Sequence, residues 1–131
     1  MRVLFALAPL ALVAACATSG PADDGVTPAG VDKIVDMTAT LNFAPNAVTI
    51  NSGDTVEFRN ISTFTHTVST VADTEIESQA VKLPTGAKPF DSAKIAPGAT
   101  FTHTFTTPGK YQYFCEPHVG QGMIGTVIVN P

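Results

Sequence analysis

From residue 33 onward, short stretches of alternating apolar and polar residues are separated by turn residues. Between positions 55 and 60, for example, Val56 and Phe58 alternate with two charged side chains. A period of two is typical of a strand with one face in a core, and the intervening Gly, Pro, Asn and Asp residues favour tight turns. The pattern predicts an all-β sandwich or barrel of about seven to eight strands. Strands are expected at residues 34–43, 47–51, 55–60, 66–71, 99–106, 110–115 and 123–130.

Residues 72–97 interrupt this pattern, because prolines and glycines break the longer periodic runs. A short strand or helix is expected near residues 76–83. The same stretch carries an acidic group formed by Asp73, Glu75 and Glu77. Exposed carboxylates are usually a solvated surface, and the functional alternative is a docking patch for a basic partner.

The first residues carry an export signal rather than part of the fold. An apolar run follows Arg2 and ends at Ala15, and it is too short to cross a bilayer. Its last residues, Leu-Val-Ala-Ala before Cys16, resemble the lipobox of bacterial lipoproteins. That resemblance implies that Cys16 is lipidated; the alternative is an ordinary secretory signal with Cys16 incidental. Export is expected in both cases.

The chain is therefore expected to have three parts. Residues 1–15 are the lipoprotein-type signal peptide, and residues 16–32 are the lipidated cysteine with a flexible tether rich in Ala, Gly, Pro and Asp. Residues 33–131 are the folded domain. The expected location is the periplasmic or cell-surface face of a bacterial membrane, with the domain held by the lipid at Cys16.

Composition supports a globular domain and narrows the possible partners. The chain has 131 residues, of which 44% are hydrophobic and 14% are charged, so a folded domain is expected rather than a disordered chain. The net charge is −4 and Lys and Arg do not cluster, which argues against a nucleic-acid partner. Only two cysteines occur, so a lipid on Cys16 leaves Cys115 without a disulfide partner. A bound metal would protect such a thiol from oxidation.

One loop between two expected strands carries three different soft or borderline metal donors. Cys115, His118 and Met123 offer a thiolate, an imidazole and a thioether, and Pro117 and two glycines between them allow tight turns. A fourth donor has to come from elsewhere in the chain. His66 follows a loop at the end of a strand, where it can approach the Cys115 loop, whereas His103 lies within a strand between two phenylalanines. We expect His66 to be the fourth ligand and His103 to be structural.

Two imidazoles and a thiolate with a weak axial thioether form the pattern of a blue-copper site. Thiolate and thioether favour Cu(I), and imidazole binds both Cu(I) and Cu(II), so the set suits one-electron cycling. Zinc is the competing metal, but structural zinc sites use four Cys or His ligands and do not favour a methionine.

The run YQYFCEPHVGQGMIGTVIV, from Tyr111 to Val129, resembles the cupredoxins, among them plastocyanin, pseudoazurin, amicyanin and halocyanin. The resemblance implies a Greek-key β-sandwich or barrel that binds one copper ion, cycling between Cu(I) and Cu(II). It also implies the ligands His66, Cys115, His118 and Met123. The implied function is single-electron transfer between redox proteins, with the chain acting as a monomer.

The resemblance also assigns roles to residues near the ligands, and one position departs from the family. Thr67 stands where plastocyanin-like proteins commonly have an Asn that braces the Cys loop, and its hydroxyl is expected to do part of that work. Tyr111 is expected to form a tyrosine corner.

An electron port is expected around a partly exposed His118. By analogy with the family, Val119, Ile124 and the Ala44–Pro45 turn would form its apolar rim. Phe114 is expected to point outward beside Cys115, because it has the opposite parity on the strand.

Two other function classes compete with the electron carrier. An exported copper buffer or delivery factor would use the same four ligands. A copper oxidase or nitrite reductase needs further copper sites built from many histidines, and this chain has three histidines in all. No Ser-His-Asp, paired-carboxylate or phosphate-loop pattern indicates another enzyme. We therefore expect a protein that is not an enzyme.

Overall fold

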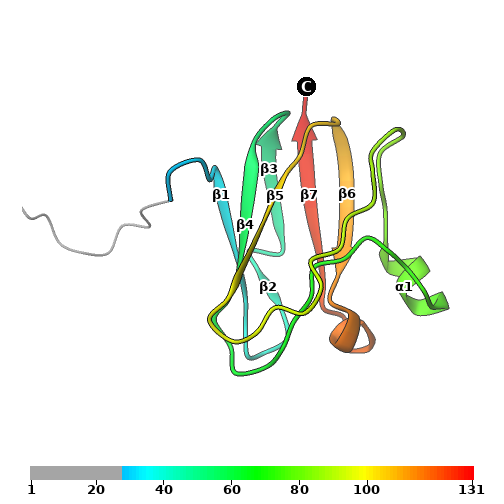
Figure 1. Cartoon of the computed structure of the whole chain (residues 1–131). Helices are drawn as coiled ribbons and strands as arrows, with labels where there is room; N and C mark the ends of the chain where they lie inside the picture. The colour runs from blue at the N-terminus through cyan, green and yellow to red at the C-terminus, as the bar shows by residue number, and fades with distance from the viewer. Residues whose placement is uncertain (1–27) are drawn as a thin grey trace, which may run out of the picture.

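The computed structural model describes residues 28–131, and the signal segment, Cys16 and most of the tether lie outside these residues. Seven strands and two short helices make up the described part (Figure 1). The strands are β1 (Lys33–Met37), β2 (Phe43–Ala44), β3 (Ala47–Asn51), β4 (Thr55–Asn60), β5 (Thr100–Thr104), β6 (Gly109–Phe114) and β7 (Ile124–Asn130). The helices are α1 (Glu75–Ala80) and the 3-10 helix η1 (Glu116–Gln121).

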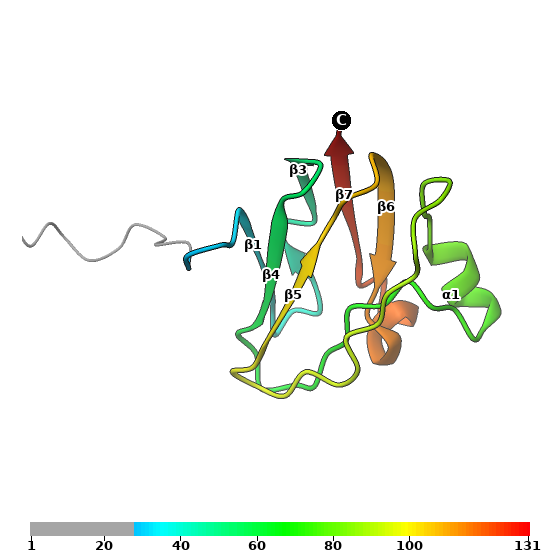
Figure 2. The ribbon, with the colours of Figure 1, turned by 45° about the horizontal axis from the view of Figure 1, so that its top comes forward.

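The strands form two sheets that face each other, as Figures 1 and 2 show. One sheet has the order β2-β1-β4-β5 and the other the order β3-β7-β6. The pairs β1/β4 and β3/β7 are parallel, and the remaining pairs are antiparallel. This arrangement confirms the expected all-β sandwich, with a strand number inside the expected range.

The core lies between the two sheets, and the alternation of the strands explains it. In β3, Val48 and Ile50 are buried while their neighbours are exposed. The centre is aromatic: the ring of Tyr113 lies edge-on to Phe43 and Phe58, with ring centroids 4.7 and 5.3 Å away. Each fully buried side chain of this size contributes about 1.5–3 kcal/mol of hydrophobic stabilisation. The end of the core is therefore a rigid frame for the residues beyond Tyr113.

Two of the expected strands differ from the observed ones. The stretch 34–43 is divided into β1 and β2 by a turn in which Leu41 has a φ of 59°. The expected strand 66–71 was wrong, because this segment forms only isolated bridges to Ile95, Asp91 and Phe114. Side-chain hydroxyls take the place of regular ladder partners there. The hydroxyl of Ser92 accepts the Val68 N–H, for example, so no continuous ladder forms.

The helix α1 lies where a short strand or helix was expected, and it changes the interpretation of the acidic group. Thr74 and Glu77 form a capping box, in which the Glu77 carboxylate accepts the backbone N–H groups of Asp73 and Thr74. The hydrogen bond from Asp73 holds the pKa of Glu77 below its ordinary value. Glu77 is therefore a capping residue whose carboxylate is committed to the start of α1, while Asp73 and Glu75 stay exposed.

The loops that carry the candidate ligands meet at one end of the sandwich. In Figure 1 this is the lower end, where the segment after β4, the segment before β5 and η1 lie together, opposite the C-terminus. Tyr111 stabilises the other end of β6 as a tyrosine corner, since its hydroxyl donates to the Thr107 carbonyl over 2.7 Å. Within residues 28–131, the helices are too short and too polar to cross a membrane.

Candidate metal centre

The loop after β6 holds its three candidate donors together through its own backbone. The His118 N–H donates to the Cys115 carbonyl, and the Cys115 N–H donates to the Met123 carbonyl, both over 3.1 Å. The loop closes at Gly122, which has a φ of 82° and donates its N–H to Val119. A left-handed residue at this point favours glycine. Backbone hydrogen bonds thus close the segment from Cys115 to Met123 into one loop that holds the three candidate donors together.

His66 reaches the same place from the segment after β4. Two backbone hydrogen bonds to Ile95, of 3.2 and 2.8 Å, fix its position. Its Nδ1 lies 3.6 Å from the Cys115 Sγ, and the Nδ1 of His118 lies 3.4 Å from the same sulfur. One donor atom from each of the three residues falls within 4.8 Å of the other two. The sequence prediction that His66 approaches the Cys115 loop agrees with this geometry.

The centre is closed to water on most sides. Cys115, His66 and Met123 are fully buried, and Cys115 and Met123 belong to the main hydrophobic core. His118 is half-buried and is the one of the four candidate ligands with an edge toward solvent. His118 is therefore the side on which the candidate ligands are accessible to solvent.

Burial at the centre disfavours the charged forms of Cys115 and His66. Burial raises the pKa of the Cys115 thiol, with hydrogen bonds from Thr67 and His118 opposing the shift. Burial and the nearby His118 lower the pKa of His66, with a smaller opposing effect from the Thr38 carbonyl. Without a metal, the site therefore favours a neutral thiol and a neutral imidazole. A metal ion replaces the thiol proton and compensates the thiolate charge.

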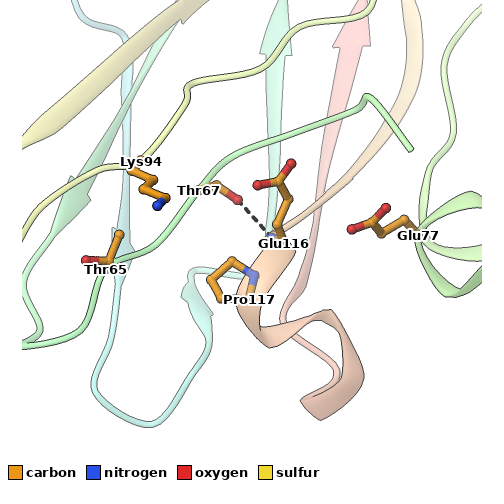
Figure 3. Close-up of a pocket in the computed structure, with 6 residues that line it drawn as sticks. All are labelled: Thr65, Thr67, Glu77, Lys94, Glu116 and Pro117. Carbon is orange, nitrogen blue, oxygen red and sulfur yellow. Dashed lines mark hydrogen bonds between the residues drawn. The ribbon is translucent and has the colours of Figure 1, made fainter. Parts of the chain in front are cut away.

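Thr67 braces the two loops against each other, as expected from the sequence. Its hydroxyl accepts the Glu116 N–H over 2.8 Å, the bond drawn in Figure 3. Its own N–H donates to the Cys115 Sγ over 3.3 Å. One residue thus fixes the start of η1 and also stabilises the sulfur.

The sequence did not reveal a polar network behind His66. The Ser62 hydroxyl lies 2.9 Å from the His66 Nε2 and 2.8 Å from the Asn60 Oδ1. Both Ser62 and Asn60 are buried. The signal available in the sequence was two polar residues at the end of a strand, shortly before the histidine, where a solvated turn was the simpler interpretation.

The expected exposure of two electron-port residues was wrong, whereas the Ala44–Pro45 turn is exposed as expected. Phe114 is 0% exposed and Val119 is 8% exposed, because they pack against Ala80 of α1. Only Ile124 among the expected rim residues of this loop is half-exposed. The apolar side chain that does lie against His118 is Phe64, whose ring centroid is 6.3 Å from that of His118.

Two apolar side chains in the segment after β4, Ile61 and Phe64, are exposed. Phe64 is 47% exposed and Ile61 is 62% exposed. Exposed side chains of this size next to a half-buried ligand are typical of a contact surface rather than of a core. We call Phe64, together with the exposed edge of His118, the apolar rim.

His103 has the structural role expected for it. Its ring stacks on Phe90 with centroids 4.0 Å apart, and its edge faces Phe105. It is not part of the donor group formed by His66, Cys115 and His118. Burial lowers the pKa of His103, as it does for an imidazole packed among aromatic rings.

An acidic hollow lies beside the Cys115 loop (Figure 3). It has a volume of about 490 Å³ and is lined by Thr65, Thr67, Glu77, Lys94, Glu116 and Pro117. Burial and the charges of Asp91, Glu77 and Asp73 raise the pKa of Glu116. Lys94 lines the same hollow and opposes this shift, so the hollow holds two carboxylates and one ammonium group.

The residues present fit a copper ion better than zinc. A buried thiolate with two imidazoles is a donor set for copper, and the fourth candidate in the same loop is a thioether rather than a fourth Cys or His. The hydrogen bond from Thr67 to the sulfur is the kind of outer contact that tunes such a site.

Comparison with known proteins also indicates a copper-binding protein. The model of the family described as copper binding proteins, plastocyanin/azurin family, matches residues 29–130. The chain is similar to chloroplastic plastocyanins of Oryza sativa subsp. indica, with 42% identity over 97 residues, and of Tetradesmus obliquus, with 41% over 98 residues. These matches cover 69% and 75% of this chain, but only 56% and 65% of the two relatives.

Solved structures show the same fold. A reduced mutant of amicyanin superposes with a TM-score of 0.60 at 26% identity, covering 78% of this chain and 84% of the amicyanin chain. With the family model matched along nearly all of residues 28–131, this chain belongs to the plastocyanin/azurin family of copper-binding proteins.

Proposed function

We propose that the protein is a blue-copper electron carrier, with His66, Cys115, His118 and Met123 as the ligands of one copper ion. The observation that carries the proposal is the group of three donor atoms within 4.8 Å, closed by backbone hydrogen bonds and buried at the end of a rigid core. Copper bound there would supply a Cu(I)/Cu(II) couple. The chain itself provides fixed donors and excludes water, so little rearrangement accompanies a change of oxidation state.

Electrons would enter and leave through the apolar rim. His118 is the candidate ligand with an exposed edge, and the exposed ring of Phe64 lies beside it. Apolar surface allows close approach of a redox protein without the desolvation of charges. The negative charges of Asp91 and Glu116 lie nearby and would favour a partner with a positive face. We expect the carrier to act as a monomer that meets its partners one at a time.

Electron-transfer rates of copper-loaded variants test the rim. Phe64→Glu should slow bimolecular exchange with redox proteins by about tenfold, because the apolar contact would then have to desolvate a carboxylate in place of the Phe64 ring. The matched control is Ile128→Glu, since Ile128 is 41% exposed on the outer face of β7. Equal rates for Phe64→Glu, Ile128→Glu and the unmodified protein would remove the rim from the proposal.

A copper buffer or delivery factor is the second candidate, and the half-exposed His118 is the observation that favours it. A ligand with an open edge is also a route by which copper itself can leave. An electron carrier passes on electrons, whereas a delivery factor passes on the copper ion itself. A carrier exchanges electrons rapidly and retains copper against a chelating acceptor, whereas a delivery factor releases copper to that acceptor.

The sequence supports an exported, lipid-anchored form of this carrier. The apolar segment ending at Ala15 and the small residues before Cys16 are the features behind this part of the proposal. A cell fractionation compares the full chain with Cys16→Ala, where loss of the lipid should move the protein from the membrane to the soluble fraction. A soluble wild-type protein would remove the anchor from the proposal and leave the copper site unaffected.

A further inference from the structure

The Ser62 hydroxyl uses all of its hydrogen-bonding capacity behind His66. It lies 2.9 Å from the His66 Nε2, accepts the Phe64 N–H over 3.1 Å, and donates to the Asn60 Oδ1 over 2.8 Å. A hydroxyl has one proton to donate and two lone pairs to accept with. Once the acceptor of the Ser62 hydroxyl proton is known, the donor and the acceptor in each of these hydrogen bonds are also known.

Asn60 identifies that acceptor. Its Nδ2 donates to two backbone carbonyls, those of Phe64 over 2.7 Å and Ile95 over 2.9 Å. Its Oδ1 accepts the Ser62 N–H over 3.0 Å. A flipped amide would place its NH2 against that N–H and its oxygen against two carbonyls, so the orientation is fixed. The amide oxygen next to the Ser62 hydroxyl can only accept.

The proton of the Ser62 hydroxyl therefore points at an oxygen. The Phe64 carbonyl, 3.3 Å from the hydroxyl, is also an acceptor. The Ser62 proton is therefore donated to an oxygen whether it goes to Asn60 or to Phe64. The hydroxyl then has lone pairs, not a proton, for the His66 ring. The Nε2 of His66 must carry the hydrogen, which leaves its Nδ1 unprotonated and 3.6 Å from the Cys115 Sγ.

We propose that Ser62 is a positioning residue of the metal centre: it accepts the Nε2–H of His66, backed by Asn60, and so presents the His66 Nδ1 to the metal. Metal-binding histidines commonly donate their second ring nitrogen to an outer acceptor, which fixes the tautomer and ring orientation. Here a neutral hydroxyl does this, and because its proton is committed to Asn60 it cannot turn to donate to the ring. The inference rests on the proposed ligand set.

Nitrogen NMR of the metal-free protein tests the tautomer directly. Long-range ¹H–¹⁵N correlations should show His66 protonated at Nε2 in the wild type, and a mixture of the two tautomers in Ser62→Ala. Ser62→Thr keeps a hydroxyl and should retain the wild-type tautomer. Thr63→Ala, at the exposed neighbouring position, is the matched control and should leave the His66 signals unchanged.

Copper affinity, measured by competition with chelators for Cu(I) and Cu(II), is the second readout. Ser62→Ala should lose roughly 10–100-fold in affinity, as is usual when the outer partner of a ligand is removed. Ser62→Thr should recover most of it, and Thr63→Ala should match the wild type. A purely structural role for Ser62 would lower the stability of the metal-free protein without changing the tautomer or the affinity.

Two results would overturn the proposal. One is a wild-type His66 protonated at Nδ1 in the metal-free protein, a result that needs no variant to fold. The other is a Ser62→Ala protein with the wild-type tautomer and affinity, in which case the Thr38 carbonyl, which also interacts with the ring, holds the proton. A wild type that binds no copper would instead refute the ligand set, while the tautomer measurement would still stand on its own.

Discussion

The hydroxyl of Thr67 accepts the backbone N–H of Glu116 over 2.8 Å, and this bond joins two segments that lie 49 residues apart. Thr67 follows His66 directly, and Glu116 follows Cys115 directly. The bond therefore fixes the distance between two proposed ligands. Family members commonly use an Asn for this purpose, and the structure shows that the shorter threonine side chain reaches.

Thr67→Val should destabilise the protein by about 1–3 kcal/mol, because it leaves the Glu116 N–H without its partner at nearly the same side-chain volume. Urea unfolding of the metal-free protein measures this. The Thr67 N–H bond to Cys115 is a backbone bond and should remain. Thr65→Val, at an exposed position in the same segment, is the control; equal midpoints for the two variants would refute a bracing role for the Thr67 hydroxyl.

Tyr113→Phe should leave stability unchanged or raise it by about 1 kcal/mol. Among the described residues, the Tyr113 hydroxyl is the buried side-chain group without a hydrogen-bond partner in the protein. Burial also raises the pKa of Tyr113, so the group stays neutral. Thermal unfolding of the two proteins compares them. A loss of more than about 1 kcal/mol would mean that the hydroxyl has a partner, such as a buried water.

Gly125→Ala should destabilise the protein by about 1–3 kcal/mol through overpacking. A Cβ at this position would overlap the outer ring atoms of Tyr113. The loss should shrink in a Tyr113→Leu background, because the shorter side chain lacks those atoms, and a double-mutant cycle measures the coupling. Gly120→Ala is the control, since a Cβ there meets no atom within 4 Å. Additive losses would contradict the steric explanation.

His103 should make the protein less stable as the pH falls below the ordinary imidazole pKa of 6.5. Burial lowers the pKa of the folded state, so between the two values the unfolded chain takes up a proton that the folded chain does not bind. The stability is fully present above pH 6.5 and is lost toward the lower, folded-state pKa.

His103→Phe should reduce this loss, because phenylalanine keeps the stacking on Phe90 and does not titrate. Unfolding of the metal-free proteins between pH 7.5 and pH 5 gives the comparison, and groups that titrate in both proteins cancel. Parallel stability curves for the variant and the wild type would show that His103 makes no contribution.

The sequence predicted the parts of the fold that depend on local pattern. Alternating residues located most of the strands, and the spacing of Cys115, His118 and Met123 identified one loop with three donors. His66 was found because only one other histidine competed, and His103 was set aside by its place among phenylalanines. The structure brings together the three donors whose atoms define the centre.

The parts that could not be predicted depend on long-range contacts. Parity correctly placed Phe114 on the face opposite Cys115, but the sequence did not reveal that α1 covers this face with Ala80. Glu77 was taken as a surface charge, although Thr74 three residues earlier was a readable capping signal. Ser62 looked like a loop residue because its partners, Asn60 and the His66 ring, come together only through the turn itself.

The visible absorption and EPR spectra of the purified protein after addition of Cu(II) show directly whether a blue-copper site forms. We expect an intense thiolate-to-copper charge-transfer band that disappears on mild reduction, returns on reoxidation, and is missing in Cys115→Ser. The buried Cys115 sulfur with an imidazole nitrogen on either side is the reason for this expectation. A colourless protein that binds copper only as Cu(I), or that prefers zinc, would contradict the electron-carrier function.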